Sequence, residues 1–322
     1  MRVAAVDCGT NSIRLLVADV ADVADVAAGR SAADGGAPAT LTDVVRRMEV
    51  VRLGAGVDRT GRLAPDALER TFAALRDYAA QARDLGAERV RMVATSATRD
   101  AENRAEFVDG VRAILGVDPE VATGGEEAAL SFAGATGELR ARPDVVAPYL
   151  VVDIGGGSTE FVLGNAEGAT AARSVNIGCV RLLERHLADD PPTSAQVEAL
   201  VADVREALDV VRETVDLAAA RTLVGVAGTV TTIAGLALGH EEYDAERIHL
   251  SRISEAAVDE VTERLLGMTA AQRAELGVMH PGRADVIGAG SLVLREIVRA
   301  VGTGDVVASE HDILDGIALS LA

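Results

Sequence analysis

Apolar residues recur along the chain with two periods, and each period predicts a different kind of element. Short apolar runs bounded by turn residues predict strands, at residues 3–6, 13–20, 44–53, 90–94, 149–152, 159–163, 171–175, 222–226 and 305–308. Helical spacing predicts helices, at residues 65–85, 99–115, 126–139, 180–187, 194–215 and 312–321, with more between the 225–231 turn and Ala300. Strands and helices mixed throughout predict α/β layers rather than a helical bundle or a β-sandwich.

One pattern in the chain occurs twice. Asp7 opens the sequence D-C-G-T-N-S-I-R-L-L-V, and Asp153, 146 residues later, opens D-I-G-G-G-S-T-E-F-V-L. Each copy is the end of an apolar strand at Asp, a Gly-containing turn with Ser, and a second apolar strand. A repeat spaced by nearly half the chain is typical of two similar domains. We predict a first domain of residues 1–122 plus 305–322, which includes a returning C-terminal helix, and a second of residues 123–304.

The composition of the two turns suggests phosphate binding. Small residues let backbone N–H groups approach a phosphate closely, and Ser, Thr and Asn add further donors. The Asp that ends each strand would repel phosphate unless a cation such as Mg²⁺ lay between them, since Mg²⁺ takes carboxylate and phosphate oxygens together. We therefore expect residues 9–12 and 155–159 to face each other across an interdomain cleft. A third turn, residues 225–231, fits phosphate or nucleoside binding at a helix N-terminus and fits simple packing equally well.

Composition narrows the chemistry further. All 31 basic residues are Arg, and without Lys neither a Walker-A phosphate loop nor a Schiff-base enzyme can be built. The formal net charge of −19 argues against nucleic acid and anionic membranes as partners. A polyanionic substrate would then need a local site lined by Arg.

Several features indicate a cytoplasmic protein. Cys8 and Cys179 do not make a disulfide framework, and Arg2 leads into only four apolar residues, which is too few for a signal peptide. The uncharged stretch 222–239 is rich in Thr and Gly and is better explained as a strand, a turn and a helix than as a membrane span. Residues 21–42, rich in Ala, Asp and Gly, are expected to form an expanded hairpin loop without chemistry.

The paired turns resemble the phosphate-binding loops of the acetate kinase/Hsp70/actin superfamily. Further segments resemble those of the Ppx/GppA (exopolyphosphatase/guanosine pentaphosphatase) family, and they lie at residues 94–103, 124–128, 153–160, 176–182 and 283–287. The chain departs from the family in two respects. Its last helix opens with Asp312-Ile-Leu-Asp-Gly in place of an Arg-Glu-Gly segment, and it lacks the C-terminal helical extension of the longer members.

The resemblance implies two RNase H-like (actin-like) domains and a role for each site residue. Glu127 would activate a water for attack on the terminal phosphorus, with Glu126 as the alternative, because adjacent helical residues point about 100° apart. Asp7 and Asp153 would hold Mg²⁺, or Mn²⁺ as a substitute, with Glu160 as a weaker candidate. Arg99 would supply a bidentate cationic fork. The other expected substrate contacts are Asn11, Ser12, Gly156, Gly157, Ser158, Thr159, Gly228 and Thr229.

The resulting hypothesis is a phosphoanhydride hydrolase: an exopolyphosphatase that releases terminal orthophosphate, best from short chains. The alternative substrate is guanosine pentaphosphate (pppGpp). A kinase of the same superfamily and a non-catalytic nucleotide-binding scaffold are the other hypotheses. We expect small phosphorylated partners, no nucleic acid and no membrane, and the sequence leaves a homodimer open.

Overall fold

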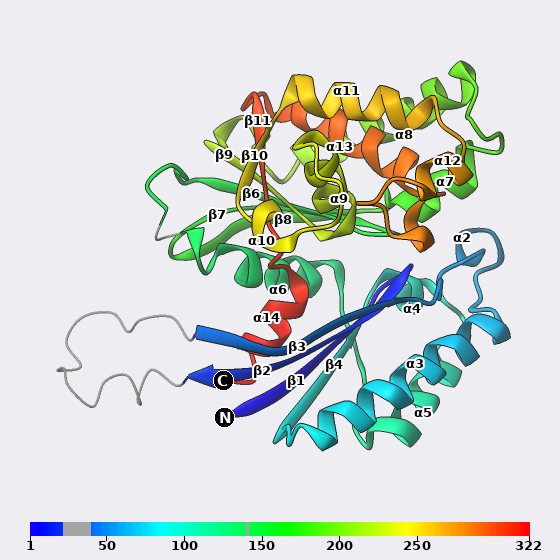
Figure 1. The fold of residues 1–322 in the computed structure, drawn as a ribbon, viewed down its shortest axis with the longest axis vertical. Helices are drawn as coiled ribbons and strands as arrows, with labels where there is room; N and C mark the ends of the chain where they lie inside the picture. Colours follow the sequence, from blue (N-terminus) through cyan, green and yellow to red (C-terminus); the bar gives the residue numbers. More distant parts are fainter. Residues whose placement is uncertain (22–39, 140–141) are drawn as a thin grey trace. The chain divides into compact units, whose positions relative to one another are not determined.

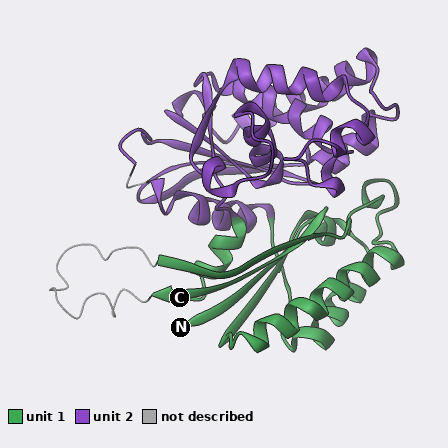
Figure 2. Ribbon diagram, viewed as in Figure 1, with its two compact units in different colours: residues 1–123, 313–322 green, residues 124–312 purple. Residues whose placement is uncertain are grey.

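The structure of the protein is a computed structural model that describes residues 1–21, 40–139 and 142–322 (Figure 1). Most of the loop expected at residues 21–42 lies outside the described residues. The chain forms two compact units, unit 1 of Met1–Thr123 with Ile313–Ala322 and unit 2 of Gly124–Asp312 (Figure 2). Among the described residues, no helix is long and apolar enough to cross a membrane.

Unit 1 is built on a five-stranded sheet of order β3-β2-β1-β4-β5. Its strands are β1 (Arg2–Cys8), β2 (Ser12–Ala21), β3 (Thr40–Val50), β4 (Arg89–Ala94) and β5 (Glu120–Val121). The first three are antiparallel neighbours, whereas β1, β4 and β5 run parallel. Its helices are α2 (Val57–Thr60), α3 (Pro65–Asp84), α4 (Ser96–Asp100), α5 (Arg104–Leu115) and α14 (Ile313–Leu319). Helices α3 and α5 bury one face of the sheet, and α14 packs against the other (Figure 1).

Unit 2 repeats this plan with one more strand, in the order β10-β11-β9-β6-β7-β8. Its strands are β6 (Tyr149–Ile154), β7 (Thr159–Asn165), β8 (Gly168–Val175), β9 (Thr222–Val226), β10 (Ser251–Ser254) and β11 (Asp305–Ala308). Its helices are α6 (Gly124–Thr136), α7 (Cys179–His186), α8 (Ser194–Arg212), α9 (Ala227–Ala237), α10 (Ala245–Ile248), α11 (Glu255–Leu266), α12 (Ala270–Ala274) and α13 (Ile287–Val301). Short 3-10 turns occupy Leu217–Ala219 and Pro281–Arg283.

Strand alternation divides the core of unit 2 between the two faces of its sheet. Leu150, Val152 and Ile154 of β6 pack with α8, α9, α11 and α13. Tyr149 and Val151, which point to the opposite face, pack with α6. Helix α6 therefore packs on this face of the sheet, and polar residues that share the face of Tyr149 and Val151 point toward the side that α6 covers.

Both sheets have the same core topology, three antiparallel strands followed by two parallel ones. This is the RNase H-like arrangement, so the predicted fold class is confirmed. One assignment was wrong: the strand at 305–308 was placed in the first domain, but β11 pairs with β9 and β10 in the sheet of unit 2. A four-residue strand carries too little pattern to reveal which sheet it joins.

Other elements also differ from the sequence prediction: helix α2 and the two-residue strand β5 were not predicted, and two further differences have a clear cause. The single helix expected at 99–115 is two helices, α4 and α5, because the Asn103 side chain binds the backbone N–H and C=O of Leu63 between them. Strand β10 was not predicted, since Ser-Arg-Ile-Ser has one apolar residue and pairs only at the sheet edge.

Candidate active site

The two repeated turns have the same backbone hydrogen bond. In unit 1 the Gly9 N–H donates to the Ser12 carbonyl at 2.9 Å, and in unit 2 the Gly155 N–H donates to the Ser158 carbonyl at 3.1 Å. Each turn follows the first strand of its sheet, which runs parallel to the strand that leads into α4 or α9. From the ends of these two neighbouring parallel strands, the chain continues toward opposite edges of the sheet. Open α/β sheets bind ligands at such a point, outside the carboxyl ends of the strands.

In unit 2, the carboxylates of Asp153, Glu160 and Glu127 lie between the sheet and helix α6. Asp153 lies on the face of β6 that carries Tyr149 and Val151, and its cross-strand neighbour Glu160 shares that face. Helix α6 covers this face and presents Glu127 to it. All three carboxylates are buried.

Serine hydroxyls hold two of the three carboxylates. Ser131, one helical turn after Glu127, donates to Asp153 Oδ2. Ser174, the cross-strand neighbour of Glu160 on β8, donates to Glu160 Oε1 at 2.7 Å, and Ser158 binds the same carboxyl group. The other oxygen, Glu160 Oε2, is buried and has no hydrogen-bond partner among the described residues. Neither Ser131 nor Ser174 was predicted, although the spacing of Ser131 from Glu127 was a signal.

The three buried carboxylates disfavour one another's charged forms, as the pKa of Glu160 shows. Burial raises the pKa of Glu160 well above its usual range, and the nearby charges of Glu127 and Asp153 raise it further. A cation would bind the Glu160 oxygen that has no hydrogen-bond partner within the described part of the chain and would offset the neighbouring carboxylate charges. The residues present therefore fit Mg²⁺, which binds through one or two carboxylates and completes its shell with water and phosphate oxygens.

The adjacent residues Glu126 and Glu127 occupy different environments. Glu127 is buried against the sheet, whereas Glu126 is exposed. The first residue of α6, Gly124, packs on Ser174 so closely that an added Cβ would lie 2.5 Å from the Ser174 Cβ. The start of α6 is therefore fixed against the strand that holds Glu160, which also fixes the position of Glu127.

Helix α7 supports the 155–158 turn from behind. The Gly156 carbonyl accepts the N–H groups of Val180 and Arg181, and the Gly157 carbonyl accepts Arg181 Nε at 2.7 Å. At Gly178 an added Cβ would lie 2.2 Å from the Gly156 carbonyl carbon. The Gly156 and Gly157 carbonyls therefore bind helix α7.

The Thr159 side chain does not reach toward solvent. It is fully buried, and its hydroxyl donates to the Ile177 carbonyl at 2.7 Å. This hydroxyl already has a structural partner, which does not favour a phosphate contact by the Thr159 side chain.

The third turn lies at the end of the neighbouring strand β9. Ala227 begins α9 with φ of 67°, a backbone strain of about 1–3 kcal/mol for a residue with a Cβ. The Arg283 guanidinium lies directly on Gly228, where an added Cβ would be 2.2 Å from Arg283 Nη1. Thr229 is buried and hydrogen-bonds Cys179, whose pKa burial raises to about 11. The structure thus brings Arg283 to this turn, although its sequence segment was noticed only through the family resemblance.

In unit 1 the equivalent Asp has a different partner. Arg14 lies at the repeat position of Glu160, and its Nε and Nη2 donate to Asp7 Oδ2 at 2.9 and 2.7 Å. Asp7 therefore has a cationic neighbour, whereas Asp153 has carboxylate neighbours. The repeat conserves the backbone turn and reverses the charge beside it, so the acidic cluster belongs to unit 2.

The other predicted residues of unit 1 lie near its turn. Asn11 and Ser12 are half-buried, and the Asn11 carbonyl accepts the N–H groups of Val51 and Arg52. Arg99, in the last turn of α4, donates to the Ala122 carbonyl at 2.8 Å. Arg99 is thus held beside the segment that leads into unit 2.

A cluster of possible metal ligands in unit 2 has a structural role. Glu138, His249 and His311 place one ligand atom each within 4.8 Å of one another. However, the Glu310 N–H donates to His249 Nδ1 at 3.1 Å, so neutral His249 carries its proton on Nε2 and donates it to Glu138 at 3.0 Å. A metal on Nε2 would require a proton on Nδ1 facing that N–H donor, which disfavours metal binding.

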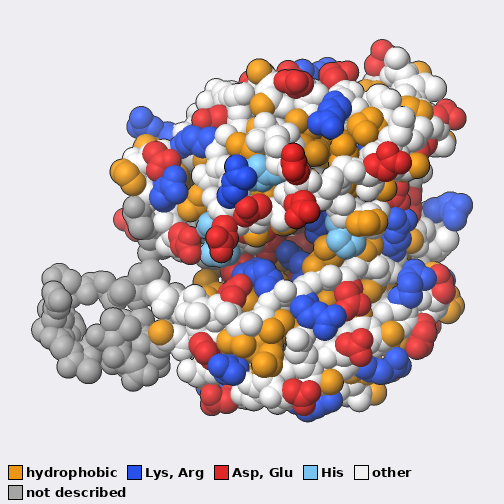
Figure 3. Space-filling view, viewed as in Figure 1, with side chains coloured by type: hydrophobic (Ala, Val, Ile, Leu, Met, Phe, Trp, Pro, Cys, Tyr) orange, Lys and Arg blue, Asp and Glu red, His pale blue; other side chains and the backbone are white. Residues whose placement is uncertain are grey.

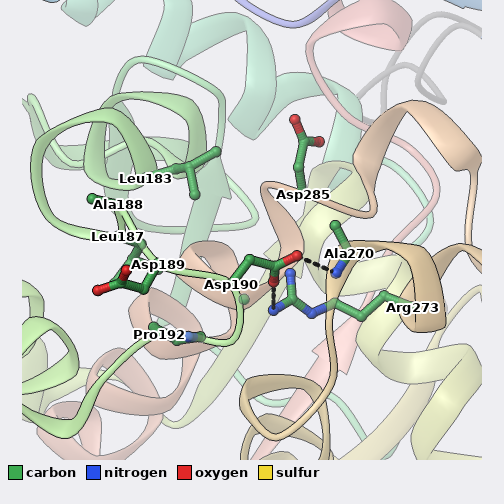
Figure 4. Close-up of a pocket in the computed structure, with 10 residues that line it drawn as sticks. Leu183, Leu187, Ala188, Asp189, Asp190, Pro192, Ala270, Arg273 and Asp285 are labelled. Atoms are coloured by element: carbon green, nitrogen blue, oxygen red, sulfur yellow. Dashed lines mark hydrogen bonds and ion pairs between the residues drawn. The ribbon is translucent and has the colours of Figure 1, made fainter.

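A pocket of about 120 Å³ lies between the end of α7, helix α12 and the start of α13 (Figure 4). Arg273 in its wall donates to three backbone carbonyls and to Asp190. The pocket is smaller than usual ligand sites of about 300–1,000 Å³, and none of the predicted site residues lines it. We assign it a structural role.

Both sheets have the RNase H-like topology, and each has a Gly- and Ser-containing turn at the end of the same strand. This fold and these turns are typical of α/β proteins that bind phosphate groups. The family model of the Ppx/GppA phosphatase family matches residues 30–322. The chain therefore belongs to the Ppx/GppA phosphatase family, a family of phosphoanhydride hydrolases.

Individual relatives agree with this assignment. The chain is 53% identical to Exopolyphosphatase 2 of Mycobacterium tuberculosis, over 100% of this chain and 98% of that protein. The crystal structure of an exopolyphosphatase-like protein, 45% identical, covers 100% of this chain and 98% of its own, with a TM-score of 0.91. Guanosine-5'-triphosphate,3'-diphosphate pyrophosphatase of Aeromonas hydrophila is 33% identical over 78% of this chain and 46% of that protein.

Proposed function

We propose that the protein is an exopolyphosphatase that hydrolyses the terminal phosphoanhydride bond of inorganic polyphosphate. The observation that carries this proposal is the cluster of Glu127, Asp153 and Glu160 beside the 155–158 turn. Similarity to a full-length exopolyphosphatase supports the choice of polyphosphate as the substrate.

In the proposed mechanism, the chain supplies the base and the positioning. Glu127 takes a proton from the attacking water, whose oxygen bonds to the terminal phosphorus while the bridging P–O bond breaks and its electrons go to the shortened polyphosphate. General-base help of this kind contributes about 10²–10⁴-fold, and positioning and charge stabilisation supply the remainder. Asp153, oriented by Ser131, and Glu160 would hold Mg²⁺, which neutralises phosphate charge when it is bound.

The metal proposal predicts a change in Mg²⁺ dependence. Asp153→Asn replaces a hard-cation carboxylate with a neutral amide, so the Mg²⁺ concentration for half-maximal activity should rise, with a parallel loss of Mn²⁺ binding measured by electron paramagnetic resonance. Asp7→Asn should have a smaller effect, because Asp7 is paired with Arg14. Unchanged Mn²⁺ binding and Mg²⁺ titration in Asp153→Asn would contradict the proposed site.

The charge distribution predicts a preference for short chains. Binding a long polyanion requires a continuous basic groove, and its salt dependence scales with the number of contacts. Acidic and basic side chains are interspersed on the face drawn in Figure 3, and many Arg side chains pair locally, for example Arg91 with Glu120 and Arg252 with Asp305. We expect a higher kcat/KM per chain end on short polyphosphate than on chains of hundreds of units, with shallow salt dependence. A strong rise with chain length that collapses in salt would contradict this prediction.

The function itself is tested by phosphate release from short polyphosphate, long polyphosphate and pppGpp, side by side with Mg²⁺. ATP with candidate acceptors serves as the kinase control. Release from polyphosphate supports the proposal, and phosphoryl transfer without release would replace it with a kinase. Ligand binding without turnover would indicate a scaffold.

We also propose a cytoplasmic location, because Cys8 and Cys179 are free, buried thiols of raised pKa that are suited to a reducing compartment. A homodimer is a further proposal, which sedimentation analysis at several concentrations would test.

A further inference from the structure

Ser174 is held in place beside the carboxylate cluster of unit 2. Strand register pairs this residue of β8 with Glu160 on β7, and its hydroxyl donates to Glu160 Oε1 at 2.7 Å. The first residue of α6, Gly124, packs against the same side chain, since an added Cβ there would lie 2.5 Å from the Ser174 Cβ and 2.9 Å from its Oγ. Strand register, the helix and the hydrogen bond therefore hold the Ser174 hydroxyl against one oxygen of Glu160.

The two oxygens of Glu160 consequently differ in their surroundings. Oε1 accepts the Ser174 hydroxyl, whereas Oε2 is buried and has no hydrogen-bond partner among the residues that the structure describes. The Glu160 side chain is only 1% exposed, so solvent does not compensate Oε2. A buried carboxylate oxygen without a hydrogen bond is costly, and a bound cation would remove that cost. One oxygen is thus taken by the protein and the other is suited to a metal ion.

The neighbouring carboxylate also has a serine donor. Ser131 is fully buried on α6, and its hydroxyl donates to Asp153 Oδ2. Such hydrogen bonds restrict how a carboxylate can bind a cation. Bidentate binding needs both oxygens directed at the same ion, and the carboxylate of Glu160 cannot turn both of them toward it without breaking the bond to Ser174.

We infer that Ser174 is a specificity-determining residue, which makes Glu160 bind a divalent cation through Oε2 alone and thereby favours Mg²⁺ over Ca²⁺. Mg²⁺ needs a near-octahedral shell and takes one or two carboxylates with several waters, whereas Ca²⁺ accepts about six to eight oxygens and binds carboxylates in bidentate as well as monodentate fashion. Holding Oε1 against Ser174 removes the bidentate mode, which suits the larger ion. The inference rests on the proposed metal site and adds a determinant of the metal that the site selects.

The experiment measures metal binding separately from catalysis. Mn²⁺ bound to the full-length, substrate-free protein is followed by electron paramagnetic resonance and displaced with Mg²⁺ or with Ca²⁺. Ser174→Ala releases Oε1, while Ser158 still binds the Glu160 carboxyl group. The ratio of Mg²⁺ affinity to Ca²⁺ affinity should fall about tenfold, since residues that hydrogen-bond a metal ligand typically affect metal affinity by about 10–100-fold. Ca²⁺ should also inhibit Mg²⁺-supported phosphate release at a lower concentration than in the wild type.

Two further variants separate selectivity from structure. Ser131→Ala removes the donor to Asp153 and should shift the ratio in the same direction. Ser251→Ala makes the same chemical change on β10 of the same sheet, where the hydroxyl donates to the Ile248 carbonyl at 2.7 Å, and should leave both affinities unchanged.

An equal fall of Mg²⁺ and Ca²⁺ affinity in Ser174→Ala would indicate a merely structural role and would overturn the inference. A wild-type ratio in both Ser174→Ala and Ser131→Ala would overturn it as well. Failure of the proposed hydrolase function is distinguishable, because it would abolish phosphate release in the wild type while displacement of Mn²⁺ still measures the selectivity.

Discussion

Glu127→Gln is expected to lower kcat for phosphate release by at least about 10²-fold, the usual scale for losing a general base. The amide has nearly the same shape as the carboxylate but cannot take a proton from water. The substitution also removes a buried carboxylate charge that raises the pKa of Glu160, so this pKa should fall toward its usual range and the Tm should not decrease. Large loss of turnover without loss of stability is the combination expected for a catalytic base.

Glu126→Gln is the matched control for this experiment. It makes the same chemical change one residue away, at an exposed position of the same helix. Both variants are assayed for initial rate on short polyphosphate and for thermal unfolding. If Glu126→Gln loses activity while Glu127→Gln retains it, the base is Glu126 and the buried cluster has another role.

Gly178→Ala is expected to disrupt the phosphate turn of unit 2. The new Cβ would lie 2.2–2.3 Å from the backbone of Gly156 and Gly157, and backbone cannot rotate away as a flexible side chain would. Forced overpacking costs about 1–3 kcal/mol in the free energy of unfolding. Displacing the turn by about 1 Å would also cost about 10²-fold in turnover. We expect kcat/KM and Tm to fall together.

Gly137→Ala controls for the loss of a glycine in the same unit. No atom lies within 4 Å of a Cβ built there, so this substitution should leave activity and Tm close to wild type. Activity assays and thermal unfolding of both variants decide the matter. A Gly178→Ala protein with normal activity would mean that the turn can shift without consequence, which would argue against its role in holding phosphate.

Much of the fold could be predicted because its signals are local. The strand–turn–strand repeat at Asp7 and Asp153 predicted two similar domains, and both turns have the expected Gly-to-Ser hydrogen bond. Periodicity located most elements to within a few residues. The prediction failed where the determining contact is distant in sequence, as for Asn103, which binds Leu63 and divides one predicted helix into two.

The candidate site divides in the same way. The sequence by itself was enough to locate the candidate turns and their acidic residues. A strand end that carries Asp, Gly and Ser is recognised from a few neighbouring residues. Only the tertiary structure separated Glu127 from Glu126, since burial depends on which face of α6 meets the sheet. It also paired Asp7 with Arg14, bound Ser131 to Asp153 and placed Arg283 on Gly228. These contacts are set by strand register and by the packing of α6 and α13 on the sheet, which no single segment of the sequence encodes.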